Sequence, residues 1–388
     1  MSKRPTENEK NLSGLDRKKF QKTISGKQTD LFILKTKNDS ELAVTNYGCA
    51  ILAIMVPDKN GQFANVVLGH DSIDSVVNSP EPFLNTVIGR YGNRICEGKF
   101  TLNNKEYNLS VNNGPNALHG GPTGYHTQVW DVVEQTEDSI TFSYISPDGE
   151  EGFPGTLRIE MTYRLIPAKD TTFFHIQYVA KTDKATPVNL TNHAFFNLAG
   201  IDNPSPSIEN HTLTIAADHY IPIDNNSIPT GEILSVEGTP MDFRKPHRIG
   251  ERINDNFQQL IHGAGYDHCY VLNKTEAGNL ELAAVCAEEH SGRIMEVYTT
   301  EQGVQLYTGN WLSGFAGANG ATFPARSGVC FEAQKFPDTP NRPYFPTAIL
   351  KPKEEYRQTT IYMFHVEGTK IDTRFKRDKK YTFRAKNK

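Results

Sequence analysis

Residues 157–166 read LRIEMTYRLI, and apolar side chains alternate with polar ones from Leu157 to Leu165. A period of two residues is the pattern of a β-strand with one buried face. A second run rich in apolar and aromatic side chains follows at Phe173 to Ala180. These runs predict two strands, and they indicate an all-β fold.

The same pattern extends along the chain in both directions. Leu31–Leu34 and Leu42–Thr45 flank a polar turn and predict a hairpin, and Ile51–Val56 is a further strand that ends at the turn Pro57–Gly61. Helices are expected only at Ser72–Val77 and Gly250–Leu260. The other predicted strands are Phe100–Leu109, Ile140–Ile145, His211–Ala216, Tyr270–Leu272, Leu280–Cys286, Ile294–Thr299, Val304–Thr308 and Thr359–Val366.

The chain shows no low-complexity linker and no change of composition in its middle. We therefore predict one domain over residues 17–388, a large sandwich of two twisted sheets. Residues 1–16 are polar and charged and lack the apolar core of a signal peptide, so they are expected to form a disordered leader. As written the chain is predicted to be cytoplasmic, or periplasmic or secreted where a targeting segment has been removed.

Composition excludes several classes of protein. The 388 residues include 41 Lys and Arg against 45 Asp and Glu, so the chain lacks the positive excess that nucleic-acid binding requires. The mean hydropathy of -0.52, with no apolar run near ~18 residues, argues against a membrane span. The five cysteines are odd in number and none are spaced as a zinc or redox pair, so neither a metal cluster nor disulfide dependence is expected.

Two histidines lie in polar tracts that close strand-rich runs. His119 lies in NALHGG at residues 116–121, and His193 lies in NLTNHAFFNL at residues 189–198. A third polar residue, Glu332, lies far downstream in FEAQ at residues 331–334. With ordinary pKa values of ~6.5 and ~4.3, an imidazole can give a proton while a carboxylate takes one. The combination predicts proton transfer on an uncharged polar substrate.

Each of these residues also has a plainer interpretation. A histidine in a loop usually just makes hydrogen bonds, and a buried Glu332 is compatible with an ion pair as well as with catalysis. Arg90 and Arg94 lie in GRYGNRI at residues 89–95. We interpret Arg90 as a surface salt-bridge residue, and Arg94, between glycine-bearing turns, as a donor to sugar hydroxyls or carboxylates.

Seven segments taken together resemble the aldose 1-epimerases, or galactose mutarotases. They occur in the order typical of that family and span nearly all of residues 19–366. The segments are Gly89–Ile95, Asn116–Gly121, Ser146–Gly155, Asn189–Gly200, Tyr266–His268, Gly303–Asn310 and Phe331–Pro346.

The resemblance implies a β-sandwich of the galactose-mutarotase type that interconverts the α and β anomers of free hexoses. By position, His193 matches the general acid, Glu332 the general base, and His119 a second histidine that contacts the sugar near its ring oxygen. The positions that match substrate-binding residues are Asn93, Arg94, Asp267 and Gln305. With ordinary pKa values, the acidic limb of the rate profile would report Glu332 and the alkaline limb His193.

The resemblance also implies a free aldohexose as substrate, no organic cofactor and no catalytic metal, which leaves a structural ion open. No nucleic-acid or membrane partner is expected, and the protein is predicted to be a monomer or weak dimer. The chain departs from the family pattern at Tyr125-His126, Ala194-Phe195, Ala333 and Lys335. Lys335 stands where a histidine is frequent. These departures bear on the preferred sugar more than on the reaction.

Three other functions are alternatives to an aldose 1-epimerase. A noncatalytic carbohydrate-binding sandwich would not need both His193 and Glu332. A glycoside hydrolase or lyase would normally need two carboxylates beside the scissile bond, and only Glu332 has a motif around it, with Asp267 a distant second. A sugar-phosphate epimerase would need further cationic side chains beside Arg94 to bind the phosphate, and the sequence motifs supply only Arg94.

Overall fold

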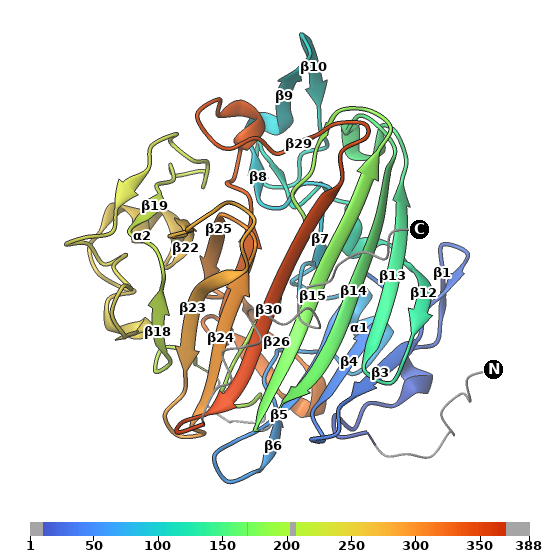
Figure 1. Ribbon diagram of the computed structural model, residues 1–388, viewed down its shortest axis with the longest axis vertical. Helices are drawn as coiled ribbons and strands as arrows, with labels where there is room; N and C mark the ends of the chain where they lie inside the picture. Colours follow the sequence, from blue (N-terminus) through green and yellow to red (C-terminus); the bar gives the residue numbers. More distant parts are fainter. Residues whose placement is uncertain (1–10, 169, 202–206, 370–388) are drawn as a thin grey trace.

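The computed structural model describes residues 11–168, 170–201 and 207–369. Strands dominate these residues, as the alternating pattern predicts (Figure 1). The two α-helices are short: α1 (Ile73–Val77) and α2 (Gln258–Gly263). Single 3-10 turns lie at Arg17–Phe20, Cys96–Gly98, Tyr125–Thr127, Glu150–Gly152, Ile249–Glu251, Ala318–Gly320 and Thr339–Asn341.

The largest sheet has nine strands in the order β12-β13-β14-β15-β30-β24-β23-β18-β21, and it faces the viewer in Figure 1. The opening stretch of sequence forms β14, which pairs antiparallel with β15 along its whole length. The strands are β12 (Asp131–Gln135), β13 (Ser139–Ser146), β14 (Leu157–Ala168), β15 (Thr171–Thr182), β30 (Tyr356–Val366), β24 (Arg293–Thr299), β23 (Glu281–Ala287), β18 (Thr212–Ile215) and β21 (His247–Arg248).

Two smaller sheets lie behind it, one of five strands and one of four. The five-stranded sheet contains, in order, β20 (Leu234–Ser235), β19 (His219–Ile221), β22 (Asp267–Val271), β25 (Gly303–Tyr307) and β28 (Cys330–Gln334). The four-stranded sheet contains β3 (Leu31–Lys35), β4 (Glu41–Thr45), β5 (Ile51–Pro57) and β6 (Phe63–Asn65).

The remaining described strands form short two-stranded ribbons. They are β1 (Thr23–Ile24) with β2 (Lys27–Gln28), β7 (Val87–Ile88) with β17 (Thr191–Asn192), β8 (Arg94–Ile95) with β11 (Ala117–Leu118), β9 (Lys99–Leu102) with β10 (Lys105–Asn108), β16 (Thr186–Pro187) with β29 (Ile349–Leu350), and β26 (Ser313–Ala316) with β27 (Thr322–Pro324).

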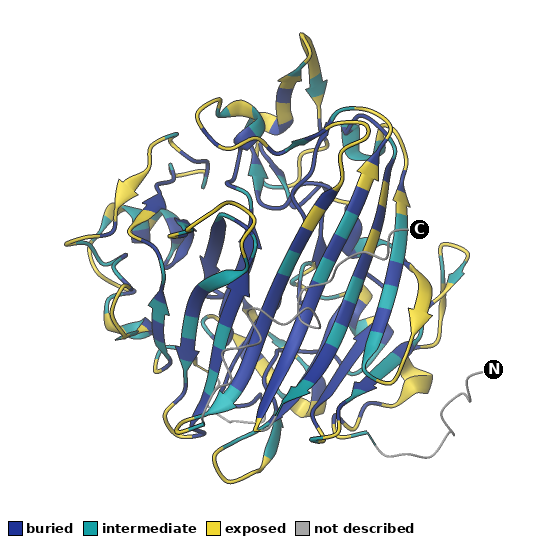
Figure 2. Cartoon of the chain, in the orientation of Figure 1, coloured by how far each residue is buried: buried dark blue, intermediate teal, exposed yellow. Residues whose placement is uncertain are grey.

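One apolar cluster joins the three sheets. It contains Ile54 from the four-stranded sheet, Tyr163 and Tyr362 from the nine-stranded sheet, and Leu306 and Phe331 from the five-stranded sheet. Figure 2 shows β12 and the β9–β10 hairpin largely exposed, whereas strands in the middle of the large sheet are mostly buried. Because the faces of the sheets pack against each other, the predicted β-sandwich is confirmed.

Two predicted elements are wrong in detail. The strand predicted at Phe100–Leu109 is the β9–β10 hairpin, because Asn103 and Asn104 adopt φ of 52° and 61° and form a tight turn. The helix predicted at Gly250–Leu260 is a 3-10 turn and the separate helix α2. Asn254, Asp255 and Asn256 lie between them, and such side chains favour turns over helix.

The predicted disordered leader, residues 1–16, also needs correction. Residues 1–10 lie outside the described residues. Leu15 is buried in an apolar cluster, and the backbone N–H groups of Leu12 and Ser13 donate to the Glu41 carboxylate at 2.8 and 3.0 Å. Residues 11–16 therefore belong to the folded body. Among the described residues, none of the helices has the length and apolar character that crossing a membrane requires.

Candidate active site

The fold brings the predicted acid and base together. His193 follows the short strand β17, and Glu332 lies in the middle of β28. His193 Nε2 is 3.6 Å from Glu332 Oε1, and the two side chains are only 6% and 2% exposed. The second carboxyl oxygen, Glu332 Oε2, has no hydrogen-bond partner among the described residues. The pair is shielded from water and keeps one oxygen available to a ligand.

Burial acts against charge on both members of the pair. It lowers the pKa of His193 to about 4. Burial also raises the pKa of Glu332 well above its ordinary value; the charge of Asp267 adds to this effect and that of Arg94 opposes it. At pH values between these two pKa values the pair therefore holds one proton, on the carboxyl side, beside a neutral imidazole. The two limbs of the rate profile are then reversed relative to the prediction from ordinary pKa values.

His119 presents a hydrogen-bond donor to the same space. Its Nδ1 accepts the backbone N–H of Asn93 at 3.1 Å, and the backbone N–H of His119 donates to the Asn93 carbonyl at 3.1 Å. Burial holds the pKa of His119 well below its ordinary value, so the ring is neutral. A neutral ring that accepts at Nδ1 carries its proton on Nε2. The His119 and His193 ring centroids are 5.2 Å apart.

The predicted binding residues form a second connected group. Gln305 pairs directly with Glu332 across β25 and β28, and its Nε2 donates to Asp267 Oδ1 at 2.7 Å. Arg94 Nη1 is 3.8 Å from Asp267 Oδ2, and Arg94 Nε donates to Asn113 at 2.9 Å. A polar row thus runs from the base across the five-stranded sheet to the arginine.

Asn93 has a different place from the other predicted binding residues. Its side-chain oxygen accepts the backbone N–H of Arg94 at 2.8 Å, and its backbone holds His119. Its φ of 65° is left-handed, a conformation that asparagine tolerates better than most residues. Asn93 therefore orients two site residues through local contacts.

Three residues of the site lie close enough together to hold a metal ion, although their spacing in the sequence does not indicate it. His119, His193 and Glu332 each offer a ligand atom within 4.8 Å of the others. Two imidazoles and a carboxylate can bind zinc. The hydrogen bond from Asn93, however, places a proton rather than a lone pair on His119 Nε2. As oriented, this donor set fits a metal ion poorly.

Several site residues were missed by sequence reasoning. Cys330 is buried and places its Sγ 3.5 Å from His193 Nδ1. Its position two residues before Glu332 in one strand is the signal that predicts a shared face. Phe83 lies against His119 and His126 at ring distances of 4.7 and 4.6 Å. No sequence pattern marks Phe83.

A further carboxyl group lies on the same segment as Phe83. Burial raises the pKa of Glu81 to about 7, and the charge of Glu81 raises the pKa values of Glu332 and Cys330. His126, a departure from the family pattern, is buried, and burial lowers its pKa to about 4. The site therefore contains more titratable groups than the motifs predict.

Arg90 is not the surface salt-bridge residue that the sequence suggested. Its guanidinium is buried and donates to the carbonyls of Pro154 and Gly155 at 2.8 Å each and to Ser146 Oγ at 2.6 Å. It holds the turn at residues 146–155. None of these hydrogen bonds involves His193 or Glu332. The arginine is structural.

Comparison with known proteins agrees with this geometry. The profile of the aldose 1-epimerase family matches residues 30–363. Galactose mutarotase from Bos taurus is 44% identical over 327 residues, which cover 83% of this chain and 90% of that protein. Aldose 1-epimerase from Escherichia coli K12 is 35% identical over 340 residues, covering 86% and 95%.

Among solved structures, an aldose epimerase homologue from C. elegans superposes with a TM-score of 0.80 at 29% identity, covering 87% of this chain and all of the other. The resemblance noted in the seven segments is thus confirmed at the level of the family. With the family profile matching most of its length, this chain belongs to the aldose 1-epimerase family.

Proposed function

We propose that this protein is an aldose 1-epimerase that interconverts the α and β anomers of free hexoses, D-galactose and D-glucose among them. The observation that supports this most directly is the buried pair of His193 and Glu332, 3.6 Å apart, with one carboxyl oxygen unpaired among the described residues. The galactose mutarotases among its relatives favour galactose as the first sugar to test.

Anomer exchange requires opening of the ring. Glu332 removes the proton of the C1 hydroxyl while His193 protonates the ring oxygen; the bond from C1 to the ring oxygen breaks, and C1 becomes an aldehyde. A sugar hydroxyl that donates to Glu332 favours the ionised carboxylate, so sugar binding moves the shared proton toward His193. Rotation about C1–C2 and the reverse transfers close the other anomer. Each positioned group typically contributes ~10²–10⁴-fold in rate.

The remaining predicted residues bind the sugar in this proposal. The His119 Nε2–H donates near the ring oxygen, and Arg94, Asp267 and Gln305 hold hydroxyls remote from C1. Asn93 contributes by orienting its neighbours. We propose that no organic cofactor or catalytic metal takes part, and the protonated Nε2 of His119 supports this. Because Asp267 is already bonded to Gln305, a hydrolase with two free carboxylates is less well supported.

Polarimetry of freshly dissolved α-D-galactose and α-D-glucose tests the proposal. We expect purified protein to speed the approach to equilibrium for at least one sugar, with the same rate after EDTA treatment. Glu332→Gln keeps the size of the side chain but cannot take the C1 proton, so it should lose at least ~10²-fold in turnover. A wild-type protein with no effect on either sugar, or a Glu332→Gln variant with more than half the activity, would contradict the mechanism.

A further inference from the structure

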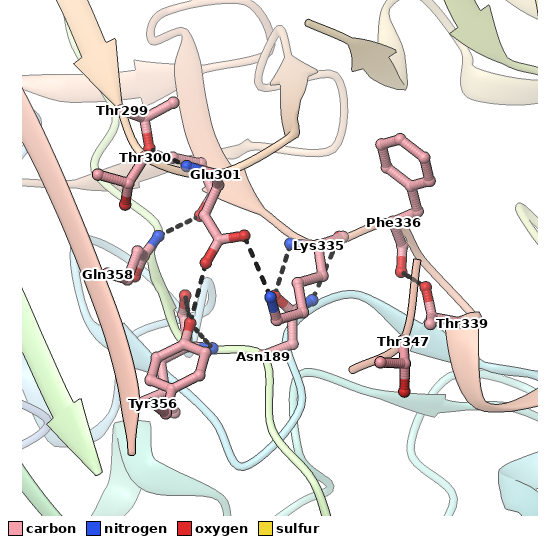
Figure 3. Close-up of polar contacts among 12 residues, drawn as sticks. Asn189, Thr299, Thr300, Glu301, Lys335, Phe336, Thr339, Thr347, Tyr356 and Gln358 are labelled. Atoms are coloured by element: carbon pink, nitrogen blue, oxygen red, sulfur yellow. Dashed lines mark hydrogen bonds and ion pairs between the residues drawn. The ribbon is translucent and has the colours of Figure 1, made fainter. Parts of the chain in front are cut away.

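A buried polar cluster lies at the end of the strand that carries the proposed base. It consists of Asn189, Glu301, Lys335 and Tyr356, and we call it the Lys335 clamp (Figure 3). Lys335 directly follows β28, and its Nζ is 3.7 Å from Glu301 Oε2. The Glu301 side chain is 5% exposed, whereas that of Lys335 is 29% exposed. The lysine therefore reaches from the surface to a buried carboxylate.

The amide of Asn189 connects three segments of the chain. Its Oδ1 accepts the backbone N–H of Lys335 at 2.8 Å. Its Nδ2 donates to the carbonyl of Gly92 at 3.0 Å and contacts the carbonyl of Lys335 at 3.4 Å. Asn189 lies four residues before His193, and Lys335 lies three residues after Glu332. One side chain thus ties the segment of the acid to the segment of the base.

Tyr356 adds a second connection between the same two segments. Its hydroxyl accepts the backbone N–H of Leu190 at 3.2 Å and donates to Glu301 Oε1 at 3.3 Å. The ammonium group of Lys335 lies 5.7 Å from the centre of the Tyr356 ring. Glu301 therefore connects Lys335 at the end of β28 with Leu190, the neighbour of Asn189.

Charge makes this connection sensitive to Lys335. A buried carboxylate is costly unless it is paired and hydrogen-bonded, and removing one partner leaves an uncompensated charge. Without the lysine, water would enter or side chains would rearrange to solvate Glu301. The backbone of residue 335 would be affected as well, because its N–H and its carbonyl are both held by Asn189.

We propose that Lys335, acting with Glu301 and Asn189, is a positioning residue that holds the strand of Glu332 against the segment of His193. The inference rests on the proposed function. The clamp touches neither sugar nor the transferred proton, and it acts on the gap between His193 Nε2 and Glu332 Oε1. A displacement of about 1 Å at such a pair can cost about 10²-fold in rate.

The test compares Lys335→Met with Lys335→Arg in the mutarotase assay, well below the melting temperature of each variant. We expect Lys335→Met to lower kcat at least ~10-fold with KM within about twofold, because the sugar-binding side chains stay in place. Lys335→Arg keeps the cation and should recover most of kcat. Lys19→Met is the matched control, because Lys19 forms a comparable ion pair with Asp71 at 3.5 Å and neither residue belongs to the clamp or to a site motif; its kcat should equal that of the wild type.

A second variant tests the proposal if Lys335→Met does not fold. Glu301→Gln removes the buried charge itself and should lower kcat in the same way. Wild-type kcat in either folded variant, even with a lower melting temperature, would assign the clamp to stability alone and overturn the proposal.

The proposed function and the clamp can fail separately. The wild-type rate tests the function, and the ratio between variant and wild type tests the clamp. If the wild type is inactive, ¹⁵N NMR of His193 still reports the clamp: loosening admits water, so the His193 pKa should rise from about 4 toward its ordinary value in Lys335→Met. An unchanged His193 titration would then count against the clamp.

Discussion

The proton shared by His193 and Glu332 shows how environment alters residue chemistry. In water the imidazole would hold a proton at higher pH than the carboxylate. In the site, burial disfavours both charges, so the imidazole becomes a weaker base and the carboxyl a weaker acid. The order of the two groups is inverted before sugar binds. Such an inversion is compatible with reversible transfer because the pair still carries one proton.

This inversion predicts the pH dependence. Because its pKa is lowered to about 4, His193 is neutral at pH 7 and becomes protonated only below pH 5. The pair gains a second proton there, so kcat/KM should fall on the acid side with a midpoint near 4. On the alkaline side, activity falls only when Glu332 loses its proton, at a pH well above the ordinary value of a carboxyl group.

The measurements are a rate–pH profile and a ¹⁵N NMR titration of His193 without sugar. Neither should show a His193 transition as the pH passes through ~6.5, the ordinary pKa of histidine. A rate that falls between pH 6 and 7, together with a His193 midpoint in that range, would show that burial does not control the pair.

The sequence motifs identified all seven proposed site residues, but not how each one is used. Their residue types carry the chemistry, so His193, Glu332 and Asp267 are recognisable from type and context. The tautomer of His119 depends on the backbone of Asn93, and the contact of Cys330 with His193 depends on two distant segments. Local sequence does not encode such contacts.

At the scale of elements, the site depends on very short strands. His193 follows β17, and Arg94 lies in β8, each a strand of two residues. Two residues are too few for a period to be recognised, so these ribbons were not predicted, whereas β14 and β15 were. The longer strands make the framework, and the short ribbons place the polar side chains at its edge.

The turn at residues 146–155 offers a prediction at this scale. Arg90→Met removes the donors to Pro154, Gly155 and Ser146 and leaves buried acceptors unpaired, each costing ~1–3 kcal/mol. We expect the free energy of unfolding to fall by at least about 2 kcal/mol in urea denaturation. Arg17→Met is the control, since Arg17 has a 59% exposed side chain in an ion pair with Asp30, and such pairs contribute at most about 1 kcal/mol. Equal losses in the two variants would refute a structural role for Arg90.

At the scale of the whole molecule, one large sheet packs on two smaller ones. The alternation of apolar and polar residues predicted most of the long strands, but not the order of these strands in the sheets. The last strand, β30, lies between β15 and β24, so its partners are far away in sequence. Local periodicity gives the buried face of a strand and leaves the choice of neighbour to packing over the whole chain. This is why the sandwich could be predicted and its topology could not.

The N-terminal segment supplies the last prediction, because it tests where the folded body begins. Leu15 is 6% exposed and lies in a cluster with Phe20, whereas Leu12, three residues earlier, is 44% exposed. If residues 11–16 are part of the fold, Leu15→Ala should lower the free energy of unfolding by about 2–3 kcal/mol, through lost burial and a remaining cavity. Leu12→Ala should change it by less than about 1 kcal/mol. Urea denaturation of the two variants beside the wild type gives the comparison. If residues 11–16 were disordered, neither substitution would change the free energy of unfolding. That result would restore residue 17 as the start of the domain.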